Sequence, residues 1–440
     1  MKLFNQLWAF FASVKLAIFT LCSLAVTSII GTVIRQGEPY SFYVTKYGAK
    51  TAQFFHILDI PEMYYSWWFL GLLGILSTNL IICSLDRIPA VLRIINADNL
   101  AVSPDRIKKM AHSREWRLSA DHPDLADLSA LLKKGGWNAD VRTQGRSELY
   151  FSQKNRWSRL GVYIVHLSIL VIFIGAIIGH FLGFKGSVMI PELRSTAIAY
   201  SAKDSSPIAL GFEVRNDSFG IEFYENGMPK VYRSSLTVLA DGQVLEQKDI
   251  EVNDPLTYRG ITFYQSSYEA YKEFIFNITE TTTGEVKQFV LPFQQQMTWD
   301  DKQLQFGIIN AEAIGQRVVR SKVWFKTGDT PATVHWLDDN ASTSISSGGK
   351  EYVLKVKQMY ATGLQVAKDP GVWVVYLGCG LMLLGLYMAF FLTHKRIWLY
   401  KHVDADGTTL NLGGSSNKNK PAFAKLFNQL ENIIDSANTQ

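Results

Sequence analysis

The chain has 440 residues, of which 48% are hydrophobic and 19% charged, and its net charge is only +5. This mild basic excess does not indicate nucleic-acid binding, and the 3 cysteines of the chain are too few for a disulfide framework. The sequence has no Gly-rich phosphate loop, no H-E-x-x-H and no G-x-S-x-G, so neither kinase nor hydrolase chemistry is indicated. The mean hydropathy of +0.04 hides long apolar runs, because polar segments dilute them.

Four apolar runs predict transmembrane helices. They lie at residues 14–34, 67–85, 160–184 and 371–393. At a rise of about 1.5 Å per residue, runs of this length can cross a hydrocarbon core of about 30 Å. Residues 1–34 are expected to be retained as the N-terminus and first span, since no small-residue cleavage pattern follows Ile34.

Basic residues gather at one end of each span. They are Lys2, Lys15, Arg87, Arg93, Lys154, Arg156, Arg159, Lys395, Arg396 and Lys401. The positive-inside rule therefore predicts that both termini and residues 86–159 are cytoplasmic. The loop 35–66 and the long segment 185–370 are then expected on the outer face of the membrane.

His166 lies inside the third run, which contains no formal charge. Ionisable side chains at membrane depth are rare and often functional, and imidazole is a common axial ligand of haem iron. A haem site within the membrane is one interpretation, and a neutral histidine hydrogen-bonded to a neighbouring helix is the alternative. His180 lies 14 residues further along the same run, about 21 Å away, so one iron cannot bind both. The sequence indicates no catalytic residue.

Residues 86–159 predict a small cytoplasmic α+β segment. The pattern favours a helix over Asp124–Lys134 and a hairpin of two strands, Trp137–Thr143 and Ser147–Gln153, around Gln144–Gly145. Contact with anionic membrane lipid is sufficient to explain its mildly basic composition, and no nucleic acid is expected as a partner.

Residues 394–440 predict a cytoplasmic tail in which a polar linker, Gly413–Lys420, leads into an amphipathic helix. The apolar face of this helix consists of Phe423, Leu426, Phe427, Leu430 and Ile434. We expect this face to rest on the membrane or on a partner.

Residues 185–370 predict a large extracytoplasmic all-β, sandwich-like domain, because short β-prone runs alternate with turns. The runs are 212–215, 221–224, 236–239, 261–264, 274–278 and 289–291. Asp241–Gly242 and Thr283–Gly284 are predicted hairpin tips, and the strand order is not determined. The predicted fold class is therefore a membrane α-helical protein of four transmembrane helices with this β domain and the small α+β segment.

Five segments carry a family resemblance. They are ASVKLAIFTL with SIIGTVIRQ (12–36), YYSWWFLGLLGILSTNLIICSLDRIP (64–89), GVYIVHLSILVIFIGAIIG (161–179), VNDPLTYRGITFYQSSYE (252–269) and DPGVWVVYLGCGLMLLGLYMAFFLTHKRIW (369–398). In this order and topology they resemble the ResB (CcsB) family of System II cytochrome c biogenesis proteins, over roughly residues 8–400. A single hydrophobic segment would not identify this family, whereas the five segments in this order do.

The resemblance implies a multi-pass protein of cytochrome c-type biogenesis in the bacterial plasma membrane, with the thylakoid membrane as the alternative. It implies a separate ResC (CcsA)-type membrane partner, with which haem is moved across the membrane and delivered to apocytochrome c. His166 corresponds to the family's intramembrane histidine, proposed as one axial ligand of a transient b-type haem. The second ligand would come from the partner. The chain would then be a non-catalytic or co-catalytic subunit of a cytochrome c haem lyase complex.

The resemblance also suggests where the partner's helices approach. Small residues of the third and fourth spans would allow close helix contact there, namely Gly161, Gly175, Gly179, Gly378, Gly380 and Gly385. The main rival interpretation is a membrane-anchored extracytoplasmic binding or scaffold protein without a haem site of its own. A transporter is disfavoured, because the spans show neither internal repeats nor broken helices.

Overall fold

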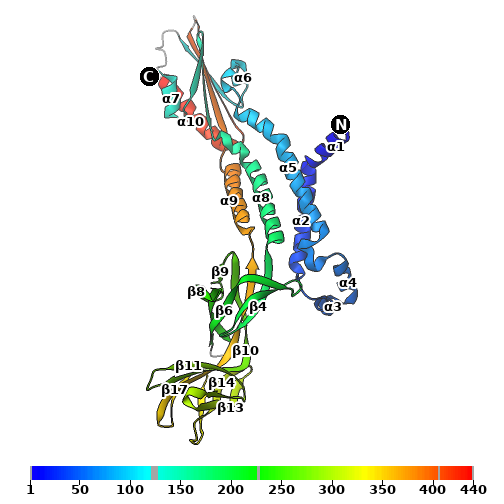
Figure 1. Cartoon of the computed structure of the whole chain (residues 1–440). Coiled ribbons are helices and arrows are strands. Elements are labelled where there is room, and N and C mark those ends of the chain that lie inside the picture. Colours follow the sequence, from blue (N-terminus) through cyan, green and yellow to red (C-terminus); the bar gives the residue numbers. More distant parts are fainter. Residues whose placement is uncertain (1, 120–126, 225–227, 405–406, 439–440) are drawn as a thin grey trace. The chain divides into compact units, whose positions relative to one another are not determined.

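The computed structural model describes residues 2–119, 127–224, 228–404 and 407–438 (Figure 1). The chain divides into two compact units, one of residues 1–175 with 373–440 and the other of residues 176–372. The first unit contains most of the helical structure and a small sheet, whereas the second is built mainly from β-strands.

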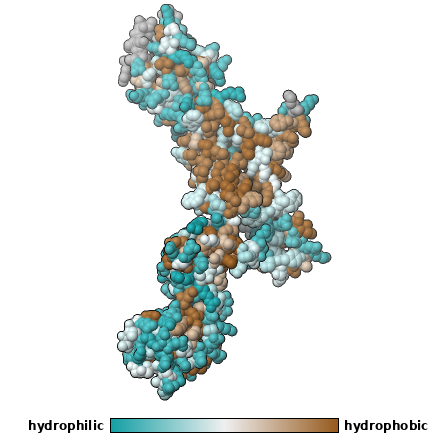
Figure 2. Space-filling model, viewed as in Figure 1, coloured by the Kyte–Doolittle hydropathy of each residue, from teal (hydrophilic) through white to brown (hydrophobic). Residues whose placement is uncertain are grey.

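Four helices are long and apolar enough to cross a membrane, as predicted, within the described part of the chain. They are α2 (Val14–Val33), α5 (Trp67–Ile95), α8 (Gly161–Leu182) and α9 (Val372–Phe390). Figure 2 shows hydrophobic surface concentrated over these helices. Helix α5 continues ten residues past the predicted limit at Leu85, since the charges of Asp86 and Arg87 end the apolar run but not the helix.

Shorter helices precede the second long helix. They are α1 (Lys2–Phe11), α3 (Tyr40–Tyr47), α4 (Ala49–Ile57) and the 3₁₀ segment η1 (Ile60–Tyr65). The buried Asn79 of α5 donates from Nδ2 to the backbone oxygens of Phe11 and Ser13, at 2.5 and 3.1 Å. These bonds reach carbonyl groups at the break between α1 and α2, of which that of Ser13 also accepts from the Ala17 nitrogen at 3.3 Å.

Glycines bring α8 and α9 of this chain into close contact. A Cβ added at Gly385 would lie 2.8 Å from the Val165 nitrogen, and one added at Gly378 would lie 3.1 Å from the Ser168 oxygen. Gly161 faces the Ala389 backbone in the same way, whereas Gly380 has open space around its Cβ position. The expectation that these glycines receive a partner's helix therefore has to be changed, because three of them already pack the chain's own helices.

A five-stranded antiparallel sheet forms what we call the small sheet domain. Its order is β1-β19-β18-β3-β2. The strands are β1 (His112–Ser119), β2 (Asp140–Gln144), β3 (Ser147–Lys154), β18 (Lys395–Asp404) and β19 (Gly407–Ser416). The predicted hairpin about Gln144–Gly145 is confirmed by the pairing of β2 with β3. Two strands from the C-terminal tail, coloured orange to red in Figure 1, complete the sheet beside β3 and β1.

Helices cover both faces of this sheet. On one face α7 (Leu128–Lys134) and α10 (Lys420–Asn438) pack over a core that includes Trp137 and Leu412. The first residues of the helix predicted at Asp124–Lys134 lie outside the described residues. On the other face η2 (Asn99–Ala101) and α6 (Pro104–Lys108) contribute to a second, smaller cluster.

The structure corrects the predicted tail in two ways. Gly413 and Gly414 belong to β19 rather than to a polar linker. Both positions need glycine, because Ile107 and the rings of Phe423 and Phe427 occupy the space that a Cβ would take. The apolar face of α10 is buried in the small sheet domain, so it is not free to rest on a membrane or partner.

The second unit confirms the all-β prediction, and we call residues 184–368 the large β region. Its strands are β4 (Phe184–Pro191), β5 (Ser195–Ser201), β6 (Pro207–Phe223), β7 (Pro229–Ala240), β8 (Gln243–Ile250), β9 (Leu256–Tyr258), β10 (Ile261–Glu280), β11 (Val286–Pro292), β12 (Gln296–Trp299), β13 (Leu304–Ile314), β14 (Arg317–Thr327), β15 (Thr333–Asp338), β16 (Ser342–Ser347) and β17 (Lys350–Lys368). Both predicted hairpin tips, Asp241–Gly242 and Thr283–Gly284, connect paired strands.

The strands form a ten-stranded sheet and a four-stranded sheet. One hydrophobic cluster joins residues of both sheets, including Phe276 and Leu354 of the large sheet and Phe306 and Phe325 of the small one. A second cluster lies along the rest of the large sheet. The prediction of short strands was wrong for β10, of 20 residues, which bends at irregularities near Ser267 and Phe274 instead of ending there.

Candidate functional site

His166 lies in α8 and contacts α5 through a single hydrogen bond. Its Nδ1 lies 3.0 Å from Oγ of Ser84, a residue 82 positions earlier in the chain. The imidazole is half-buried, and its centroid lies 6.2 Å from that of the Tyr163 ring, one turn earlier in α8. The sequence did not point to Ser84, since a serine in an apolar run carries no information about which distant helix it faces.

Two adjacent faces of α8 make different contacts. His166, Ile169 and Phe173 follow one another at helical spacing, and the latter two pack against the hydrophobic cluster of α5 that contains Leu76 and Leu80. The neighbouring face packs on the glycines of α9 described above. Helix α8 is thus held from two sides, which limits the rotation that could move the imidazole.

The serine contact occupies Nδ1 and leaves Nε2 as the nitrogen that can bind a ligand. Among the described residues, Nε2 of His166 has no hydrogen-bond partner. Metal-binding histidines commonly bind through one ring nitrogen while a second residue holds the other. Both interpretations of His166 predict a contact of this kind, but an unpartnered Nε2 in an apolar environment favours the ligand.

The remaining candidate positions do not assemble around His166. His180 lies in the last turns of α8, and its ring packs on that of Phe181 at 5.0 Å. No group of three or more His, Cys, Asp and Glu side chains in the described ranges could hold a metal ion. Of the residues singled out in the sequence, only His166 therefore remains as a candidate ligand within the apolar helices.

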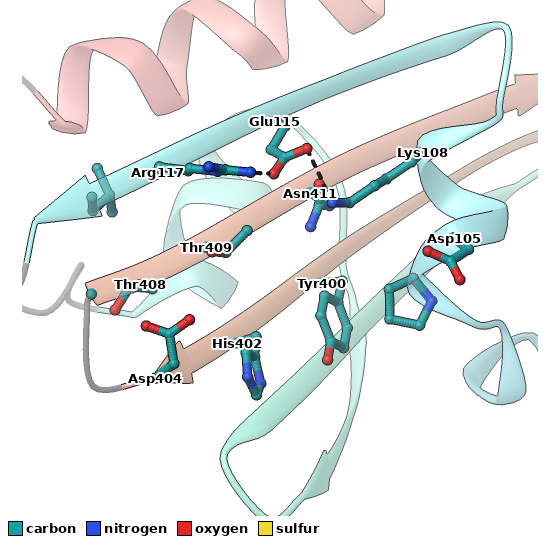
Figure 3. Close-up of a pocket in the computed structure, with 13 residues that line it drawn as sticks. Asp105, Lys108, Glu115, Arg117, Tyr400, His402, Asp404, Thr408, Thr409 and Asn411 are labelled. Carbon is teal, nitrogen blue, oxygen red and sulfur yellow. Dashed lines mark hydrogen bonds and ion pairs between the residues drawn. The ribbon is translucent and has the colours of Figure 1, made fainter.

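An open groove of about 470 Å³ lies on the small sheet domain and offers a second candidate site (Figure 3). Its floor carries Tyr400 and His402, whose rings are nearly parallel, and Oγ of Ser147 lies 2.9 Å from Oη of Tyr400 and 2.8 Å from Nδ1 of His402. Glu115 lies between two cations, 3.1 Å from Nζ of Lys108 and 3.4 Å from Nε of Arg117. Their hydrogen bonds, that of Lys108 above all, lower the pKa of Glu115.

The lining of this groove does not suit a porphyrin. Acidic and basic side chains alternate around it, with Asp105 and Asp404 at its margins, and few apolar side chains reach it. A large apolar ring gains most from apolar walls with a few fixed polar groups. A second cavity of about 420 Å³, between α3, α4 and η1, has a mixed lining that includes three carboxylates, Glu38, Asp59 and Glu62. The helix site at His166 is the better match to haem.

Comparison with known proteins identifies the family of the chain. A sequence model of the ResB-like family matches residues 14–348 and 306–428. The cytochrome c biogenesis protein CcsB of Crocosphaera subtropica is 29% identical, over 98% of this chain and 94% of the relative. The CcsB proteins of Nostoc sp. (28% identical, 97% and 91% covered) and Gloeobacter violaceus (29%, 96% and 89%) are similar to it to the same degree. This membrane protein belongs to the ResB-like family.

Proposed function

We propose that the chain is a subunit of the cytochrome c biogenesis machinery that holds haem within the membrane through Nε2 of His166. The role in cytochrome c biogenesis is supported by membership of the ResB-like family and by relatives named for that process. The observation that carries the haem assignment is the hydrogen bond between His166 Nδ1 and Ser84 Oγ, which leaves the other ring nitrogen available.

The residues present fit one side of a haem. Bound haem would supply the iron and the vinyl groups to which an apocytochrome is attached. This chain offers an imidazole held by Ser84, with apolar neighbours such as Ile169 and Phe173 on the same face of α8. A single nitrogen does not complete axial ligation, so we infer a separate ResC (CcsA)-type membrane partner that donates the second ligand.

The distribution of basic residues supports an orientation for delivery. Lys154, Arg156 and Arg159 precede α8, and Lys395 and Arg396 follow α9, so the small sheet domain would be cytoplasmic. The large β region would then lie on the outer face of a bacterial plasma membrane, or of a thylakoid, and would meet apocytochrome c there. His166, near the start of α8, would hold haem in the half of the membrane from which haem enters.

The test is an absorption spectrum of the detergent-purified protein, co-expressed with a ResC (CcsA)-type partner. We expect a Soret band in the wild type that is lost or shifted in His166→Ala, while the variant still inserts into the membrane. The matched control is His180→Ala, which removes an imidazole from the same helix and should leave the band unchanged. Imidazole added to His166→Ala should restore haem binding.

Two results would argue against the assignment. An identical Soret band in wild type and His166→Ala would move the haem site to the partner and make this chain a scaffold. No band in either protein, together with normal c-type cytochromes in cells lacking the chain, would favour the membrane-anchored binding protein.

A further inference from the structure

Strand β15 forms one edge of the four-stranded sheet in the large β region. The sheet order is β12-β13-β14-β15, so β15 pairs with β14 on one side only, and no other described strand pairs with it. An edge strand presents a row of backbone donors and acceptors that can bind a further strand.

The register shows which peptide groups of β15 face outward. The backbone nitrogen of Asp339 donates to the Val319 oxygen at 2.9 Å, and the ladder continues from there with Leu337 opposite Ser321. In an antiparallel pair, bonded positions alternate with non-bonded ones. The peptide groups of Leu337, His335 and Thr333 therefore bond to β14. Those of Val334, Trp336 and Asp338 point away from the sheet.

The Asp338 oxygen accepts a bond from the Ala341 nitrogen, so the free outward groups are those of Val334 and Trp336, whose apolar side chains are exposed. Val334 and Trp336 are 47% and 41% exposed, and they alternate with Leu337, which is buried in the core between the sheets. The Arg320 guanidinium lies 4.9 Å from the centroid of the Trp336 ring, and Nζ of Lys322 lies 5.7 Å from it. The ring is thus held in place beside the free edge.

The other edge strands of the described sheets carry features that oppose strand addition. Charged residues lie in β1 and β2, in β8 (Glu246 and Lys248) and in β11, which also contains Pro292. Strands β9 and β12 are short, with three and four residues. Strand β16 is rich in serine, and its only large side chain is buried. Charges, proline and short length are the usual protections of an edge. Strand β15 has six residues and two exposed apolar side chains, and its only formal charge is that of Asp338 at its last position; it contains no Pro or Gly.

We propose that the free edge of β15 binds an extended segment of apocytochrome c by strand addition, an inference that rests on the proposed function. Only a polypeptide in extended conformation matches donors and acceptors that recur at every second residue. An apocytochrome lacks the haem around which it folds, so extended segments are available to it. Apolar side chains at alternate positions of the bound segment would contact Val334 and Trp336.

The test measures binding of apocytochrome c with alkylated thiols to the full-length protein in lipid nanodiscs. Val334→Pro removes an outward N–H without removing a bond to β14, and proline is tolerated on edge strands. We expect this variant to bind the probe at least about tenfold more weakly. The control Val334→Ala keeps the N–H and should stay within about threefold of the wild type. Amide hydrogen exchange of residues 333–338 should slow when the probe is added to the wild type.

Several outcomes would overturn the proposal. Equal binding by Val334→Pro, in a protein with unchanged thermal unfolding, would show that the edge is not used. Loss of a dimer in Val334→Pro without loss of probe binding would make β15 an interface between two copies of the chain. If the wild type binds the probe and carries His166-dependent haem, such a failure concerns the edge alone. If the wild type binds neither haem nor probe, the proposed function itself has failed.

Discussion

Oγ of Ser84 lies 3.0 Å from Nδ1 of His166 and joins α5 to α8. Because the imidazole has two nitrogens, a partner at one of them leaves the other available to a ligand. The serine therefore acts on any metal at His166 as a positioning residue, without contacting the metal itself.

Replacement of Ser84 by alanine tests this role. If His166 binds iron, the Ser84→Ala variant should still bind haem, with an affinity reduced by at most about tenfold, because an imidazole without this hydrogen bond is free to rotate. The ratio of Soret absorbance to protein, measured during dilution of the purified complex, reports this loss. The matched control is Ser77→Ala, since Ser77 lies in the same helix and only donates to the Leu73 oxygen. Equal haem retention in both variants would leave Ser84 with no part in ligation.

Glycine at position 385 is required by the contact between α8 and α9. An added Cβ would lie 2.8 Å from the Val165 nitrogen and 3.0 Å from the Gly161 oxygen, and neither backbone atom can move independently. We expect Gly385→Ala to destabilise the protein by about 1–3 kcal/mol, since overpacking outweighs the gain in helix propensity. Gly380→Ala, at a position with open space, should be neutral or slightly stabilising. Thermal unfolding in detergent compares the two, and equal midpoints would refute this packing.

The buried His394 should make the stability of the small sheet domain depend on pH. Its Nδ1 accepts a hydrogen bond from Nε of Arg159 at 2.8 Å, and its side chain is 1% exposed. Burial, with the charges of Arg159 and Arg396, lowers the pKa of His394 from about 6.5 to about 4. Between these values the unfolded chain binds a proton that the folded one does not, so stability falls as the pH drops from 6.5 towards 4.

The expected loss is about 1–3 kcal/mol, and it should be absent above pH 6.5. Urea unfolding of the full-length protein at pH 7.5, 5.5 and 4.5, followed by proteolysis of the small sheet domain, measures it. In His394→Gln, which keeps a side-chain oxygen for Arg159, the part of the pH dependence due to the histidine should disappear. An unchanged pH profile in that variant would assign the effect to other groups.

The sequence predicted most of what depends on local pattern. The four spans follow from uninterrupted apolar runs, whatever their neighbours, and the β2–β3 hairpin follows from alternation around Gln144–Gly145. Strand β18 was missed because its basic residues also fit a membrane flank, and its partner β3 lies more than two hundred residues earlier in the chain. A pattern within one segment carries no information about so distant a partner.

The same limit applies to the candidate site. His166 was identifiable because a histidine in an apolar run is rare, and this required no tertiary contact. Ser84 was not identifiable, since serine is ordinary in such runs and its pairing with His166 arises only when α5 packs on α8. The free edge of β15 was not identifiable for the same reason, since its position depends on the order of strands and not on its own sequence.

Burial of the α10 face in the small sheet domain leads to a prediction that separates this packing from a docking role. Phe427 is 3% exposed and packs with Phe423 over Gly414 of β19. Replacement of Phe427 by alanine should destabilise the domain by about 3–5 kcal/mol, because it leaves a cavity between helix and sheet. The control Asn428→Ala, on the exposed side of the same helix, should change stability by less than about 0.5 kcal/mol. Proteolytic sensitivity of the C-terminal strands reports the difference. Unchanged stability of Phe427→Ala, with loss of membrane or partner binding, would instead restore the docking role first expected for this helix.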